Sequence, residues 1–117
     1  MQTKFDCLII GGGPAGLAAG VYLARYHRKV MIVDCAESRT ALIPESHNYP
    51  GFAHGVSGRR LLALLKEQAD GYGAGYCKGR IISLEREKQG FWANMTEIRC
   101  PRRSFYWPPA WSMYIPV

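Results

Sequence analysis

Paired cysteines with the spacing of a metal knuckle or a redox pair are missing from this sequence. Four of its 117 residues are cysteines, and no two are separated by only two residues: Cys7, Cys35, Cys77 and Cys100. We therefore expect neither a metal site nor dithiol chemistry. Cys7 and Cys35 lie in or beside apolar runs, where a buried free thiol is the usual state. Unpaired cysteines fit a reducing, cytoplasmic compartment.

Long runs of one charge are also missing. The formal net charge is +6, but the basic residues are scattered and belong to no aromatic-basic module. A basic balance points to nucleic acid when it is clustered on one face or stretch. The composition therefore indicates a mildly basic, solvated surface on one globular domain, and we expect no nucleic-acid partner.

A true membrane-spanning run is absent as well. Residues 7–24 are almost all apolar or small, which approaches the length of a transmembrane helix. However, the run contains five glycines and Pro14, and it divides into a β-rich piece and an Ala/Leu-rich piece. No signal-cleavage pattern follows it. We therefore expect neither a membrane anchor nor a signal peptide.

What the sequence does contain is the pattern of a βαβ unit. Residues 5–10 are short, apolar and ended by glycines, which predicts a buried parallel strand. Residues 14–28 are predicted to form a helix, and residues 30–33 a second strand that ends at Asp34. This order of elements within about 30 residues predicts an α/β fold with a parallel sheet.

The turn between the first strand and the helix carries the pattern Gly11-x-Gly13-x-x-Gly16. The first glycine allows the sharp turn, the second leaves room for a pyrophosphate, and the third lets helix and strand pack closely. Backbone N–H groups at the helix start then face the phosphates. The alternative is a glycine-rich turn that binds no ligand. In its βαβ context the pattern predicts a Rossmann-type dinucleotide site formed by Gly11, Gly12, Gly13, Pro14, Ala15 and Gly16.

Asp34 is the acidic partner of this turn. It follows Gly11 by 23 residues and ends the second predicted strand, where an acid accepts hydrogen bonds from ribose hydroxyls. A carboxylate there disfavours a 2′-phosphate, which argues against NADP at this site. The alternative is an ordinary exposed acid after a strand.

The remaining elements are weaker in pattern. Residues 35–56 are predicted to be a long loop, because turn formers are frequent and no periodicity is sustained. Ser57 is predicted to cap a helix whose buried face holds Leu61, Leu65, Ala69 and Tyr72. Residues 80–84 and 91–95 are predicted to form a small β-hairpin or meander.

Several motifs taken together resemble the thioredoxin-reductase-like FAD oxidoreductases, which have two dinucleotide-binding domains. The match covers about residues 4–95, and its most specific part is the loop Ser46-His47-Asn48-Tyr49-Pro50-Gly51-Phe52. The other motifs are DCLIIGGGPAGL at residues 6–17, Val33-Asp34, Ser38-Arg39, and residues 55–74. Many flavoproteins share the glycine turn, so the turn alone does not identify a family. The Asn-Tyr-Pro-Gly loop is what narrows the resemblance to the thioredoxin-reductase-like family.

The resemblance implies a specific cofactor and roles for loop residues. The first Rossmann unit would hold the ADP part of FAD, Arg39 would neutralise phosphate, and His47 and Asn48 would lie near the cofactor. As ordinary loop residues, Arg39 would instead be a surface charge and His47 would cap a turn. In the intact family enzyme, NADPH or NADH binds a second domain, and a homodimer is one expected assembly.

The last segment of the chain changes character. Residues 101–117 hold four of the seven prolines and two of the three tryptophans, so we expect 99–117 to be an irregular tail. The resemblance implies a strand reading Leu-Leu-Ala-Thr-Gly after the hairpin. Codons for Phe105 to Tyr114, read in a shifted frame, can encode Leu-Leu-Ala-Thr-Gly-Val-Val-Asp-Val. We therefore hypothesise a frame slip between about residues 98 and 105.

These observations predict a Rossmann-like FAD-binding unit, residues 1–98, that is incomplete at its C-terminus. In the intact enzyme, hydride would pass from NAD(P)H to the flavin and on to an acceptor. No residue here is a candidate acid, base or nucleophile, so we expect the chain alone to be inactive. One alternative is a non-catalytic remnant or binding module with weak or no FAD binding. Another is the NAD-binding domain of a dehydrogenase.

Overall fold

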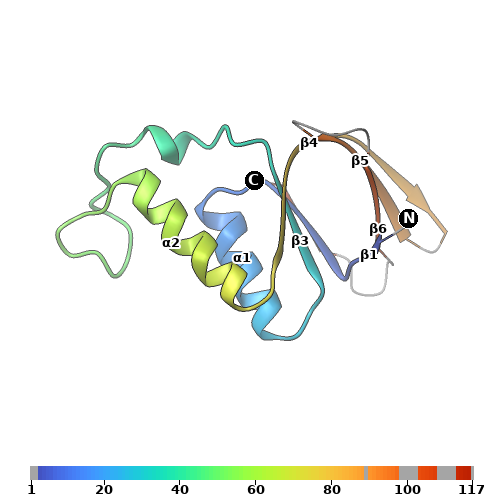
Figure 1. The fold of residues 1–117 in the computed structure, drawn as a ribbon, viewed down its shortest axis with the longest axis horizontal. Helices are drawn as coiled ribbons and strands as arrows, with labels where there is room; N and C mark the ends of the chain where they lie inside the picture. Colours follow the sequence, from blue (N-terminus) through green and yellow to red (C-terminus); the bar gives the residue numbers. More distant parts are fainter. Residues whose placement is uncertain (1–2, 89, 98–102, 108–112, 117) are drawn as a thin grey trace.

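The start of the chain folds into the predicted βαβ unit (Figure 1). Strand β2 (Cys7–Ile10) lies parallel to β3 (Val30–Asp34), and helix α1 (Pro14–Arg25) joins them. The register places the ends of both strands at the same edge of the sheet. The computed structural model describes residues 3–88, 90–97, 103–107 and 113–116.

Helix α1 ends earlier than the sequence pattern suggests. Its last residue is Arg25 rather than a residue near Arg28, because His27 adopts a φ of 58° that a right-handed helix excludes. The helix begins at Pro14, whose fixed φ suits the first helical position. None of the helices in the described part of the chain is long and apolar enough to cross a membrane.

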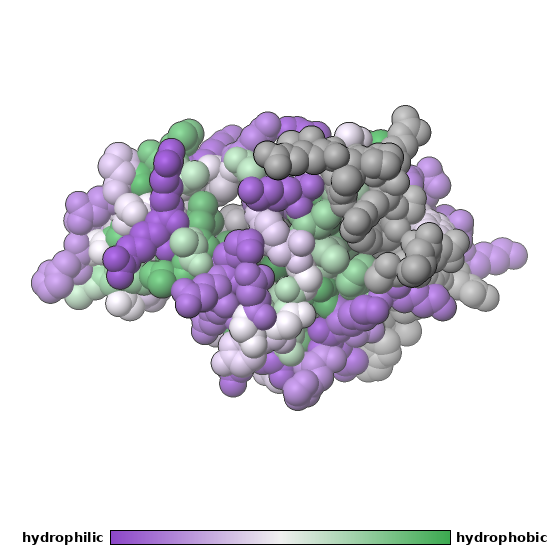
Figure 2. Space-filling view, in the orientation of Figure 1, coloured by the Kyte–Doolittle hydropathy of each residue, from purple (hydrophilic) through white to green (hydrophobic). Residues whose placement is uncertain are grey.

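Helix α2 (Gly58–Gly71) packs against α1 and is capped as predicted. The Ser57 hydroxyl accepts a hydrogen bond from the backbone N–H of Arg60 at 3.2 Å. Leu61 and Ala69 are buried on the predicted face, but Tyr72 is 49% exposed because the helix ends before it. The outer face of α2 is largely hydrophilic, and purple residues cover much of this region in Figure 2.

Strand β4 (Gly75–Glu87) is much longer than the predicted hairpin strand. Its first residues pair in parallel with β3, and its remainder pairs antiparallel with β5 (Gly90–Glu97). The parallel half was missed because glycines at positions 75 and 79 interrupt the alternating pattern of a strand. One continuous strand therefore joins the Rossmann sheet to a β-meander.

The prediction of an irregular segment at 99–117 is wrong for two stretches of it. Strand β6 (Arg103–Trp107) pairs antiparallel with β5, and β7 (Met113–Pro116) pairs in parallel with β2. Short strand β1 (Thr3–Lys4) pairs with β6. The open edges of β2 and β5 offer unpaired N–H and C=O groups, which these stretches satisfy despite the nearby prolines. The other residues of 99–117 lie outside the described part of the chain.

Within the described residues the sheet has seven strands in the order β1-β6-β5-β4-β3-β2-β7. The helices cover one face of its parallel part, and the β-meander folds toward the other (Figure 1). Adjacent residues of a strand point to opposite faces, so Ile9 joins the helix-side core and Leu8 joins the meander-side core. Each is fully buried, which contributes about 1.5–3 kcal/mol per side chain. Both cores fix the strand ends that carry the candidate site.

Candidate dinucleotide site

The glycine turn after β2 has the geometry that its sequence predicts. Gly11 adopts a φ of 114°, a region that favours glycine, and its N–H donates to the Val33 carbonyl at 2.8 Å. A Cβ on Gly16 would collide with the Gly11 carbonyl oxygen. The turn therefore depends on glycine at both positions, and it holds the start of α1 directly beyond the end of β2.

The N-terminus of α1 is suited to an anion. Gly13 is the N-cap, offers no side chain to the first turn, and is followed by Pro14. The first intrahelical bond runs from the Leu17 N–H to the Gly13 carbonyl, so backbone donors before Leu17 have no acceptor within the helix. The first turn contains no acidic residue, and the helix dipole adds a partial positive charge. This arrangement can accept a phosphate.

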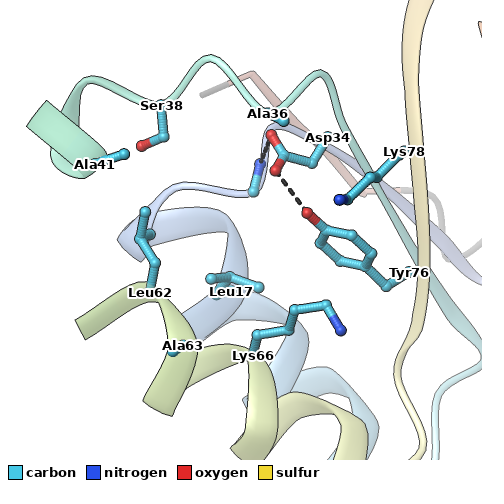
Figure 3. Close-up of a pocket in the computed structure, with 11 residues that line it drawn as sticks. Leu17, Asp34, Ala36, Ser38, Ala41, Leu62, Ala63, Lys66, Tyr76 and Lys78 are labelled. Carbon is cyan, nitrogen blue, oxygen red and sulfur yellow. Dashed lines mark hydrogen bonds between the residues drawn. The ribbon is translucent and has the colours of Figure 1, made fainter. Parts of the chain in front are cut away.

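Asp34 lies beside the turn and is nearly buried, at 8% exposure. Its Oδ1 accepts from the Gly12 N–H at 3.2 Å, and its Oδ2 accepts from the Tyr76 hydroxyl at 2.6 Å (Figure 3). A Cβ on Gly12 would lie 2.5 Å from the Asp34 Cγ, so the carboxylate needs glycine there. Asp34 is thus not an ordinary exposed acid after a strand.

Tyr76 is a residue of this site that the sequence prediction missed. Asp34 pairs with Lys78 across β3 and β4, so Tyr76, two residues earlier, lies on the same sheet face as Lys78. Burial and the neighbouring Asp34 carboxylate raise the pKa of Tyr76 above its ordinary value. The hydroxyl therefore stays protonated and donates to Asp34. Only the register of β4 could have identified it, and that register was not predicted.

The carboxylate of Asp34 opens onto a cavity of about 320 Å³, named here the Asp34 cavity. Leu17 from α1 and Leu62 from α2 supply apolar wall, and the segment after β3 closes another side. The ammonium-bearing side chains of Lys66 and Lys78 also line it. The cavity therefore combines one buried acceptor with apolar surface and nearby positive charge.

The structure places Arg39 outside this cavity. Arg39 is exposed and begins the short 3-10 helix η1 (Arg39–Leu42). The preceding residue, Ser38, lines the cavity, and its hydroxyl accepts from the Thr40 N–H at 3.3 Å. The segment between β3 and η1 is tied to β4 by the Arg80–Glu37 ion pair at 2.8 Å. Arg39 therefore directly follows a cavity-lining residue in the sequence, but its own side chain is not part of the cavity wall.

His47 and Asn48 lie in a different place from the glycine turn. They line a shallow hollow of about 430 Å³ formed by residues 47–53, named here the 47–53 hollow. Both side chains are exposed. The loop is closed by a bridge between Ser46 and Val56, and the Ser46 hydroxyl donates to the Asn48 Oδ1 at 3.0 Å. In Figure 1 this loop projects beyond the start of α2, away from the end of β2.

The structure thus brings together one group of the predicted site residues and separates another. The glycine turn, the start of α1 and Asp34 form one site. Arg39 and the pair His47–Asn48 stand apart from it. Cys7 is buried as expected, while Cys35 is only partly so. Within the described residues, no group of three or more His, Cys, Asp or Glu side chains has a metal-binding arrangement.

A parallel α/β sheet with a glycine turn, a helix N-terminus and an acid at the next strand end defines a dinucleotide-binding class of protein. The family model of the pyridine nucleotide-disulphide oxidoreductases matches residues 5–97. The chain belongs to that family, and its relatives show that it is a thioredoxin-reductase-like member.

Curated relatives include the thioredoxin reductases of Aquifex aeolicus and Borreliella burgdorferi. The first is 39% identical over 83 residues, 69% of this chain and 26% of the relative. The second is 36% identical over 89 residues, 74% of this chain and 27% of the relative. The chain therefore spans about a quarter of the length of these two relatives.

Solved structures show the same fold. The thioredoxin reductase of Gloeobacter violaceus superposes with a TM-score of 0.74 at 32% identity, over 79% of this chain and 30% of that one. The enzyme from Giardia duodenalis reaches a TM-score of 0.83 over 97% of this chain and 35% of that one, and at 23% identity it supports the fold alone. The Rossmann-type architecture predicted from the sequence is confirmed.

Proposed function

We propose that this chain provides the FAD-binding portion of a thioredoxin-reductase-like flavoprotein. The observation that carries the proposal is the buried Asp34 carboxylate, which accepts from the Gly12 N–H beside the start of α1. An acceptor for ribose hydroxyls at the end of β3 thereby lies beside the turn that offers donors for phosphate. This is the donor and acceptor set that the ADP half of FAD requires.

The residues present fit that half of the cofactor. Adding a Cβ at Gly12 would fill the space that the Asp34 carboxylate occupies, and the glycine turn leaves the helix donors uncovered. Gly11 to Gly16 would hold the diphosphate, and Asp34 would hold the ribose. We also propose, from the resemblance, that Arg39 neutralises phosphate and that His47 and Asn48 approach the flavin side. When bound, FAD supplies hydride transfer between a nicotinamide donor and an acceptor.

The chain alone is proposed to lack NAD(P)H-dependent turnover. It spans 26% and 27% of the two curated relatives named above, so a nicotinamide-binding domain would have to come from sequence beyond this match. Within the described residues the protein's own contribution is to bind and orient the cofactor. NADPH or NADH oxidation by the purified chain at a rate above free flavin would contradict this proposal.

FAD binding is tested by titrating the purified chain with FAD and following flavin fluorescence and co-elution. The matched variants are Gly12→Ala, whose new Cβ meets Asp34, and Gly71→Ala, whose Cβ meets nothing within 4 Å. We expect binding by the wild type and Gly71→Ala, and at least a tenfold loss in Gly12→Ala. No FAD binding by a folded wild type favours the remnant or binding-module alternative, and preference for NAD over FAD favours the dehydrogenase alternative.

The division into a partial FAD-binding domain at 1–98 and a frame-shifted segment at 99–117 is also proposed. Its support is that codons for Phe105 to Tyr114, read in a shifted frame, can encode Leu-Leu-Ala-Thr-Gly-Val-Val-Asp-Val. Sequencing the gene through and beyond the codon for Val117 tests it. A family-like continuation in the shifted frame is expected, and its absence would overturn the frame hypothesis without touching the FAD site.

A further inference from the structure

The Asp34 carboxylate is held from two sides before any ligand is considered. The Gly12 N–H binds Oδ1 at 3.2 Å, and the Tyr76 hydroxyl binds Oδ2 at 2.6 Å. Both bonds join a neutral donor to a charged acceptor, which is a strong kind of hydrogen bond, and the Tyr76 bond is the shorter of the two. Tyr76 therefore contributes much of the restraint on the carboxylate's orientation.

Tyr76 is itself braced from helix α2. The Lys66 ammonium lies over its ring, 4.6 Å from the centroid, and also donates to the Asp70 Oδ2 at 2.9 Å. The ring packs against the helix-side core. A continuous set of contacts thus runs from the surface of α2 through Lys66 and Tyr76 to Asp34, and Figure 3 shows the last three along one side of the cavity.

The Tyr76 bond leaves the carboxylate able to accept a ligand. A carboxylate has about four lone-pair sites, of which Gly12 and Tyr76 use two. The Tyr76 oxygen, whose O–H donates to Asp34, can also accept a hydrogen bond. Because Tyr76 lines the same cavity as Asp34, these acceptors face one shared space.

We propose that Tyr76 is a positioning residue for ribose recognition: it fixes Asp34 in the orientation that accepts the 2′- and 3′-hydroxyls of the bound dinucleotide. The inference rests on the proposed FAD function and adds a selectivity determinant to it. Without the Tyr76 hydroxyl, the carboxylate keeps its charge and its Gly12 contact but loses the bond at Oδ2. Recognition of the ribose diol should then weaken, while recognition of phosphate should not.

The test compares FAD with an FAD analogue whose adenosine ribose lacks both hydroxyls. Tyr76→Phe removes only the hydroxyl and keeps the ring under Lys66. We expect Tyr76→Phe to bind FAD about tenfold more weakly than the wild type, because Asp34 loses the hydrogen bond that fixes its orientation and meets the ribose diol less well. Affinity for the dideoxy analogue should be unchanged. The matched control is Tyr72→Phe, which makes the same chemical change at a tyrosine outside the cavity and should alter neither affinity.

A second variant gives an independent result if Tyr76→Phe fails to fold. Lys66→Met removes the ammonium over the ring, and we expect about a threefold loss of FAD affinity, again absent for the dideoxy analogue. Unchanged FAD affinity in a folded Tyr76→Phe, or an equal loss for both ligands, overturns the positioning role and leaves the FAD function standing. A folded wild type that binds neither ligand overturns both.

Discussion

The Asp34 cavity and the 47–53 hollow differ in how their polar groups are held. In the first, a nearly buried carboxylate is fixed by a backbone N–H and a tyrosine hydroxyl between packed strands and helices. In the second, exposed side chains stand on one closed loop, and the Asn48 amide is held by a hydroxyl of the same loop. Packing from distant elements thus preorganises the first site, while the contacts described for the second lie within its own loop.

Gly16→Ala is expected to break the Asp34 cavity most severely. The new Cβ would collide with the backbone carbonyl of Gly11, which cannot move as a flexible side chain would. We expect the free energy of unfolding to fall by about 3 kcal/mol and FAD binding to be lost as well. Urea denaturation measures the first. Gly71→Ala is the control, and its stability should stay within about 1 kcal/mol of wild type.

Asp34→Asn is expected to have the next largest effect. The amide would place a donor beside Gly12 or Tyr76, both of which already donate to this side chain. We expect a loss of about 1–3 kcal/mol in the free energy of unfolding and a tenfold or greater loss of FAD affinity. Glu67→Gln, on the exposed face of α2, should change neither. Wild-type affinity in Asp34→Asn would show that the carboxylate does not contact the ribose.

Stability at alkaline pH should distinguish the buried phenol from exposed ones. Burial and Asp34 raise the pKa of Tyr76 in the folded state, so its stabilising contribution is full below the unfolded pKa of about 10. The contribution is then lost as pH rises from there through the folded value. Wild type should therefore lose more free energy of unfolding above about pH 10 than Tyr76→Phe does. Denaturation at a series of pH values measures this, and parallel curves would contradict it.

The smallest effect on stability is expected in the 47–53 hollow. The double variant His47→Ala, Asn48→Ala removes two exposed side chains, and its free energy of unfolding should stay within about 0.5 kcal/mol of wild type. Its FAD affinity should fall about three- to tenfold if these residues approach the flavin. Fluorescence titration with FAD measures the affinity of the double variant. An unchanged affinity would mean that the resemblance assigns these two residues a role they do not have.

The parts of the fold that could be predicted are those determined by residues close to one another in the sequence. The β2–α1–β3 unit follows from an apolar run, a glycine turn and a helical period within one short stretch. Tyr76 was missed because its place beside Asp34 depends on which residues of β4 lie opposite β3. The Tyr76–Asp34 hydrogen bond joins positions 42 residues apart, and no local pattern in the sequence indicates it. The place of Asp34 beside the glycine turn was thus predictable, and its hydrogen bond with Tyr76 was not.

The strands of the last segment were missed for a related reason. Prolines and tryptophans around β7 obscure any strand period, while its pairing partner β2 lies at the other end of the chain. The available edge of β2 explains why β7 forms, and the local sequence of residues 113–116 does not predict a strand there. The place of Arg39 was not predictable from the motif either: it follows the cavity-lining Ser38 by one position but lies outside the cavity wall.

The contact between Gly12 and Asp34 places an evolutionary constraint on two positions that are 22 residues apart in the sequence. Any side chain at residue 12 would need the space that the carboxylate fills, so residue 12 is not free to change while the carboxylate stays in place. Among relatives of this chain, we expect a side chain at the residue after the first glycine only where the acid that ends the second strand has also changed.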